Sequence, residues 1–171
     1  MTSLQMSALE ARELRRACVH EAAHLAMLQC MGGAGQARVW RNADENADHR
    51  SWLGNMQFLA LPGSLKLPKA GRPDDVVYFR PLKRSQVYIG MAGLVAELVE
   101  FGEGDGKDAG LVCDQFFDEA ESGSLSETDA AMIGEASGPR DVITTHRLLV
   151  RCWQIVQREA DWLQTHATTN D

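Results

Sequence analysis

Two histidines and a glutamate stand close together near the start of the chain, in the stretch His-Glu-Ala-Ala-His at residues 20–24. Side chains four residues apart lie on the same face of a helix, one turn from each other. The two imidazoles can therefore reach the same metal ion, and Glu21 can reach a water molecule on that ion. This H-E-x-x-H spacing is typical of zinc peptidases, in which the glutamate is the general base. We expect His20 and His24 to bind Zn²⁺ and Glu21 to be the catalytic base.

A catalytic zinc ion usually has three protein ligands and an open position for water, so a third ligand must come from further along the chain. Glu97 belongs to an apolar stretch, where an unpaired buried carboxylate is costly and calls for a partner. Asp129 follows Ser126 by three residues, so it also fits the acidic position of a helix-capping box. His146 is more often an ordinary surface histidine, and Asp108 has only its charge in its favour. Spacing alone does not choose among these four residues.

The motif needs a helix, and the residues around it predict one. Ser7 and Glu10 have the spacing of a capping box at a helix start. Apolar residues then recur at intervals of three and four, as in a partly buried helix, until Gly32 ends the pattern. A helix of about 24 residues is roughly 36 Å long, enough to cross a small domain. Its stiff middle part would carry residues 20–24.

A small sheet is expected after this helix. Residues 37–40 form a short apolar patch, and residues 52–61 show partial alternation of apolar and polar side chains, which together indicate two strands. Prolines and glycines at residues 62–75 indicate a surface loop.

Helices are expected over most of the remaining chain. Their ranges are Pro81–Phe101, 111–121, Ser124–Glu135 and a long final helix from Pro139 to about His166. Gly90 and Gly93 fall inside the first of them, and the usual compensation for helical glycine is the close approach of another helix, here the motif helix. The fold class is therefore mainly α, of the α+β type, and 171 residues suit a single domain over residues 1–171.

Charge, hydropathy and cysteine spacing exclude several classes of protein. The net charge of −7 and the scattered basic residues argue against a nucleic-acid partner. The most apolar run, Val87–Val99, is too short to span a membrane and contains Glu97, and the N-terminus has no apolar signal-peptide core. The four cysteines form no C-x-x-C pair, which argues against a disulfide framework or a zinc knuckle. We expect a reduced, cytoplasmic protein.

Four stretches of the chain resemble, in the same order, the peptidase domain of FtsH-type proteases. His-Glu-Ala-Ala-His at residues 20–24 is similar to that family's His-Glu-Ala-Gly-His, and residues 52–58 resemble its Leu-Gly strand beside the active site. Residues 91–103 resemble its second core helix. Residues 122–133 are similar to the Thr-Gly-Ala-x-x-Asp segment that provides its third zinc ligand. The ordered combination is more specific than the first motif alone.

The resemblance implies roles for individual residues. His20, His24 and Asp129 would be the zinc ligands, and Glu21 would be the base that activates zinc-bound water. Glu97 would accept a hydrogen bond from the far nitrogen of a ligating histidine. The strand would pair with an extended peptide substrate through its main chain, and its substrate-binding residues would be Leu53, Gly54, Asn55 and Met56.

The sequence also departs from that family. It has no G-x-x-x-x-G-K-[ST] phosphate-binding loop, and we expect no ATPase module or membrane helices. The chain is then expected to be a zinc metalloendopeptidase that works without ATP on peptides or unfolded segments, served by a separate unfoldase or by a homo-oligomer. The alternative is a catalytically inactive domain of this fold that acts as a binding or regulatory module.

Overall fold

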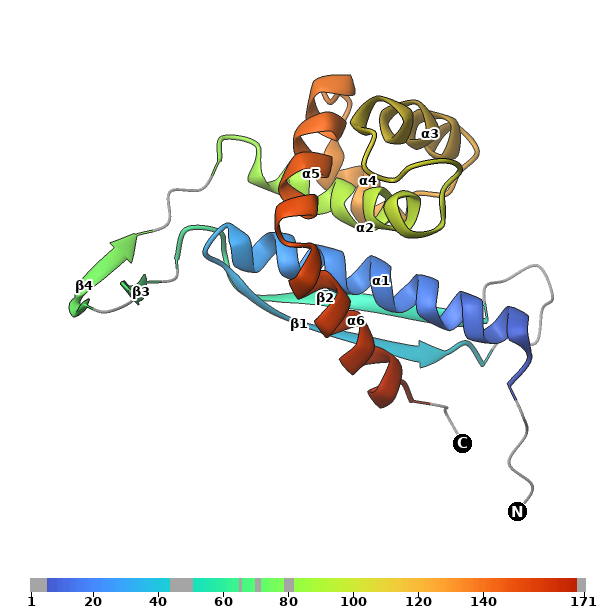
Figure 1. Cartoon of the computed structure of the whole chain (residues 1–171), viewed down its shortest axis with the longest axis horizontal. Coiled ribbons are helices and arrows are strands. Elements are labelled where there is room, and N and C mark those ends of the chain that lie inside the picture. The colour runs from blue at the N-terminus through green and yellow to red at the C-terminus, as the bar shows by residue number, and fades with distance from the viewer. Residues whose placement is uncertain (1–5, 44–50, 65, 70–71, 79–81, 169–171) are drawn as a thin grey trace, which may run out of the picture.

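The computed structural model describes residues 6–43, 51–64, 66–69, 72–78 and 82–168 (Figure 1). The elements are α1 (Ala8–Cys30), β1 (Ala34–Arg41), β2 (Trp52–Ala60), β3 (Lys66–Lys69), β4 (Arg72–Tyr78), α2 (Ser85–Phe101), α3 (Ala109–Glu121), α4 (Glu127–Ile133), α5 (Pro139–Arg151) and α6 (Trp153–His166). The protein is mainly helical with small antiparallel sheets, which confirms the predicted fold class.

Helix α1 is the central element. It starts at the predicted capping box, in which Ser7 Oγ accepts from Glu10 N and Ser7 N donates to the Glu10 carboxylate. Its flanks pack against α2, α6 and the β1–β2 hairpin, so most of its second half is buried. In Figure 1 the hairpin lies along one side of α1, and α2 to α5 lie on the other. Residues 20–24 therefore sit between the sheet and the helical layer.

The predicted two-stranded sheet is the β1–β2 hairpin, with Val39 opposite Gly54 and Ala37 opposite Met56. Asn42 N donates to Ser51 O, so residues 42 and 51 are a hydrogen-bonded pair. Such pairs alternate along an antiparallel ladder. Counted from residue 51, Gly54 and Met56 belong to the pairs that are not hydrogen-bonded to each other. Their main-chain N–H and C=O groups therefore point away from β1. On the other side of the hairpin Thr168 bonds the outer edge of β1.

The predicted close approach of the motif helix to α2 occurs at Gly93, whereas Gly90 faces α4. A β-carbon on Gly93 would lie 2.6 Å from His24 Nε2, and one on Gly90 would lie 2.8 Å from the β-carbon of Met132 on α4. Glycine at these two positions lets α1 and α4 approach α2 from different sides. The three helices that carry the metal-site candidates are thereby brought together.

Two local predictions need correction. The expected surface loop at residues 62–75 contains strand β3 and most of β4, which form a second hairpin that packs against no other element within the described residues. The expected single C-terminal helix is divided at Cys152 into α5 and α6. The division lets α5 pack on α2 while α6 packs on α1. Sequence periodicity does not reveal such a change of packing partner.

The prediction that all cysteines are reduced is also wrong for one pair. Cys30, at the end of α1, and Cys152, between α5 and α6, form a disulfide across 122 residues. They meet because α6 folds back along α1. Cys18 and Cys113 are buried free thiols. Within the described part of the chain, no helix has the length and apolar content needed to cross a membrane.

Candidate metal centre

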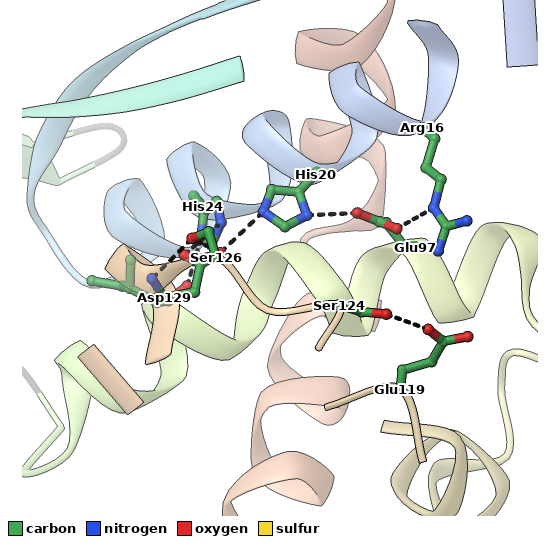
Figure 2. Close-up of polar contacts among 9 residues, drawn as sticks. Arg16, His20, His24, Glu97, Glu119, Ser124, Ser126 and Asp129 are labelled. Carbon is green, nitrogen blue, oxygen red and sulfur yellow. Dashed lines mark hydrogen bonds and ion pairs between the residues drawn. The ribbon is translucent and has the colours of Figure 1, made fainter. Parts of the chain in front are cut away.

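Helix α1 sets His20 and His24 side by side, with ring centroids 4.7 Å apart. Both rings turn toward Asp129 of α4: His20 Nε2 lies 3.3 Å from Asp129 Oδ2, and His24 Nε2 lies 3.3 Å from Asp129 Oδ1 (Figure 2). The three ligand atoms lie within 4.8 Å of one another. These three predicted residues therefore form a group that could hold a metal ion.

Asp129 stands in the first turn of α4, where the sequence suggested a capping box, but its carboxylate accepts from the Ser126 hydroxyl and not from the Ser126 main chain. Ser126 is the N-cap of α4, and its hydroxyl accepts from Asp129 N at 3.0 Å and donates to Asp129 Oδ2 at 2.7 Å. The cap fixes the first turn of α4. The same serine thus anchors the carboxylate that faces the histidines.

The far nitrogen of each histidine has its own acceptor. His20 Nδ1 lies 2.6 Å from Glu97 Oε1, and His24 Nδ1 lies 2.6 Å from the carbonyl oxygen of Ile89. An acceptor at Nδ1 favours the tautomer with hydrogen there, so the lone pair is left on Nε2. Two nitrogen lone pairs and a carboxylate then converge on one point. This donor set fits a divalent cation that takes nitrogen and oxygen ligands.

Glu97 occupies the place expected for a group behind a ligating histidine. Its side chain is only 2% exposed, and it is held between His20 and Arg16, whose Nε donates to Glu97 Oε2. Figure 2 shows these three side chains in a row. The sequence analysis missed Arg16, although its position one turn before His20 places it on the same helix face.

Glu21 is buried beneath strand β2 and lies close to Gly54. A β-carbon on Gly54 would lie 2.6 Å from Glu21 Oε1, so only glycine lets the strand pass over this carboxyl. Burial raises the pKa of Glu21 to about 7, although the neighbouring His20 acts in the opposite direction. A carboxyl with a pKa near neutrality is well matched to a general base.

In the metal-free site the pKa values of the two histidines shift in opposite directions. Burial lowers the pKa of His20, but hydrogen bonds to Asp129 and Glu97 outweigh that effect and raise it to about 10. Burial and the nearby His20 lower the pKa of His24 to about 4. Burial opposes ionisation of Asp129 and Glu97, yet their contacts with His20 hold both pKa values below the ordinary range. In the absence of a metal ion, His20 is therefore protonated and His24 is neutral at neutral pH.

A cleft of about 350 Å³ opens over this group. One wall is β2, whose predicted substrate-binding residues all line the cleft, and the opposite wall comes from the α3–α4 loop and α4. The sequence analysis did not single out this second wall, and no residue type in it marks a binding site. Its members are Ser124, Ser126, Thr128 and Met132, and the β2 wall consists of Trp52, Leu53, Gly54, Asn55 and Met56.

The other two candidate ligands lie elsewhere. His146, expected at the surface, is buried, and its Nε2 hydrogen-bonds with the carbonyl oxygen of Gly106 at 2.7 Å. Asp108 is the N-cap of α3 and accepts from Gly110 N. Both side chains thus have structural roles away from His20 and His24.

No protein-family model matches the chain, and no curated protein matches its sequence. The geometry of the cleft is therefore what indicates a function.

Proposed function

We propose that this chain is a zinc-dependent metalloendopeptidase that resembles the peptidase domain of FtsH-type proteases and works without ATP. The observation that carries the proposal is the meeting of His20, His24 and Asp129 in a cleft that also contains Glu21 and an open strand edge. Each component has a separate task in peptide hydrolysis, and all of them face the same space.

The residues of the centre divide the chemistry between them. His20, His24 and Asp129 would hold the ion, which when bound supplies Lewis-acid chemistry by polarising a carbonyl group and acidifying water. Glu21 takes the proton of the attacking water and delivers it to the leaving amine nitrogen. Burial keeps the basicity of Glu21 high enough for that transfer.

Strand β2 supports the peptide part of the proposal. The main-chain groups of Gly54 and Met56 point away from β1 at the side of the cleft. An extended peptide that pairs with this edge gains main-chain hydrogen bonds without a demand for particular side chains. Peptides and unfolded protein segments are therefore the proposed substrates, because a folded protein does not offer a free strand. A separate unfoldase or a homo-oligomer is the proposed partner for substrate delivery.

The first test measures zinc and hydrolysis together. The purified protein is expected to contain one zinc ion per chain, with anomalous scattering at the zinc edge between His20, His24 and Asp129, and to cleave an unstructured peptide library. Glu21→Gln should keep the zinc and lose about 10²- to 10⁴-fold in kcat/KM, the range for removal of a general base. The control Glu127→Gln removes an exposed carboxyl of α4 and should cleave normally.

The outcomes separate this proposal from its alternative. Stoichiometric zinc without peptide cleavage would indicate a binding or regulatory module of the same fold. Cleavage by Glu21→Gln at the wild-type rate would show that the proposed mechanism is wrong.

The proposed location is the cytoplasm, and the support for it is the cysteine spacing and the N-terminal sequence without an apolar signal-peptide core. The Cys30–Cys152 disulfide argues in the other direction, because reducing compartments keep most thiols unpaired. Thiol counting in protein taken from its native cells under acid quench decides between the two.

A further inference from the structure

The carboxylate of Glu97 is the link between the metal centre and the cleft surface. Its Oε1 lies 2.6 Å from His20 Nδ1, and its Oε2 accepts from Arg16 Nε. Glu97 comes from α2, whereas Arg16 and His20 are one turn apart on α1. Arg16 and His20 of α1 thus each contact one of the two carboxylate oxygens of Glu97 on the neighbouring helix α2.

A carboxylate in this position needs a cationic partner. The Glu97 side chain is 2% exposed, and an ionised carboxylate removed from water is costly unless it is paired and hydrogen-bonded. His20 must be neutral to give its Nε2 lone pair to a metal ion. A neutral His20 cannot balance the negative charge of the Glu97 carboxylate. Among the described residues, Arg16 is the permanently charged group in contact with Glu97.

The orientation of the Glu97 carboxylate also depends on Arg16. A carboxylate has two equivalent oxygens and can turn about its terminal bond. Because Arg16 occupies Oε2, Oε1 is directed at His20 Nδ1, which fixes the plane of the imidazole and the direction of Nε2 (Figure 2). Groups that orient a ligating histidine in this way typically affect metal affinity by 10- to 100-fold.

We propose that Arg16 is a positioning residue of the metal centre, which acts through Glu97 on His20 and sets the affinity for zinc. The inference rests on the proposed zinc site. It extends the site by one residue outside the ligand set, which also lies in the lining of the cleft, and it assigns a function to a charge that looks like an ordinary surface arginine, since the side chain of Arg16 is 43% exposed.

The test is a chelator competition for Zn²⁺ on four forms of the full chain: wild type, Arg16→Gln, Arg16→Lys and Arg12→Gln. Arg16→Gln should bind zinc about 10- to 100-fold more weakly than the wild type. Arg16→Lys, which restores the charge, should recover a large part of the loss. Arg12→Gln removes the same charge one turn earlier on an exposed side of α1 and should bind as the wild type does. Equal affinity of Arg16→Gln and wild type would overturn the inference.

A double-mutant cycle distinguishes action through Glu97 from a general structural effect. In a Glu97→Gln background, the additional Arg16→Gln change should alter zinc affinity by less than about 2-fold, because coupled residues are not additive. Full additivity contradicts the proposed route. The visible spectrum of the Co²⁺-loaded forms gives a second readout, since a reoriented His20 changes the ligand field. If the wild type binds neither ion, the proposed function fails and this inference fails with it, whereas intact wild-type binding with an unaffected Arg16→Gln variant rejects the inference alone.

Discussion

Gly93 of α2 lies directly against His24 of α1: a β-carbon at position 93 would be 2.6 Å from His24 Nε2, and it would also overlap the ring of His20. The two ring nitrogens that face Asp129 are therefore accessible because residue 93 has no side chain. A glycine in the middle of a helix is normally unfavourable by about 1 kcal/mol relative to alanine. The candidate metal centre thus depends on a residue that weakens α2 locally.

Gly93→Ala tests this dependence. The added methyl group should displace both imidazoles and reduce zinc affinity by at least about 100-fold, the equivalent of about 2.7 kcal/mol. The measurement is zinc affinity by chelator competition, with secondary structure followed by circular dichroism. Gly138→Ala is the matched control, because a β-carbon there meets no atom within 4 Å. Normal zinc affinity in Gly93→Ala would rule out the observed packing at the site.

Asp129→Asn tests the third ligand. The amide retains the size of the side chain and its place after the Ser126 cap, but it loses the charge that faces both histidines. Zinc content should fall from stoichiometric to a trace after dialysis, and hydrolysis should fall with it. The exposed neighbour Glu127, replaced by Gln, should retain one zinc ion per chain. Retention of zinc in Asp129→Asn would mean that the third ligand is another group.

The buried carboxyl group of Glu21 should cost stability in the metal-free protein. Because the folded-state pKa of Glu21 is raised to about 7 from 4.5, ionisation opposes folding, and the penalty grows as the pH rises from about 4.5 to 7. Glu21→Gln removes the penalty, so the metal-free variant should gain about 1–3 kcal/mol over the wild type between pH 5 and pH 8. Urea unfolding in the presence of a chelator measures this difference. A gain that is the same at both pH values would contradict the assigned cause.

The strand edge makes a prediction about substrate binding. The main-chain N–H of Met56 points away from β1, so a proline there removes a donor at the free edge and leaves the pairing with β1 intact. Met56→Pro should lower kcat/KM for peptides by about 2- to 10-fold relative to Met56→Ala, the value of one hydrogen bond of about 0.5–1.5 kcal/mol. Asn55→Pro, in contrast, removes a donor to β1 and should destabilise the hairpin. Equal peptide kinetics in Met56→Pro and Met56→Ala would argue against pairing at this edge.

The disulfide predicts the number of free thiols. In denaturant without reductant, two thiols should react, those of Cys18 and Cys113, and all four cysteines should react after reduction. Denaturant is needed because burial raises the pKa of Cys18 to about 12 and also raises that of Cys113. Reduction should lower the free energy of unfolding by about 2–4 kcal/mol, as expected for a long closed loop. Four reactive thiols before reduction would disprove the pairing.

Local sequence patterns stop being informative where consecutive elements pack against different partners. Periodicity predicted α1 and the β1–β2 hairpin well, because one buried face is enough to define each of them. It missed the break at Cys152, since α5 and α6 have apolar faces that continue in sequence but pack on different helices. The proline-containing second hairpin was missed because Pro68 and Pro73 read as loop residues.

The sequence by itself determined that His20 and His24 share one helix face and that Glu21 lies one turn before His24, since the helical repeat fixes the relation of residues three and four apart. It also restricted the third ligand to a few acidic or histidine residues. Only the tertiary structure shows which of them lies beside the histidines, because it places Asp129 against both, Glu97 behind His20, and Asp108 and His146 elsewhere. Contacts of that kind join residues about 80 to 110 positions apart, and they depend on which helices pack together. The spacing of residues along the chain does not predict which helices pack together.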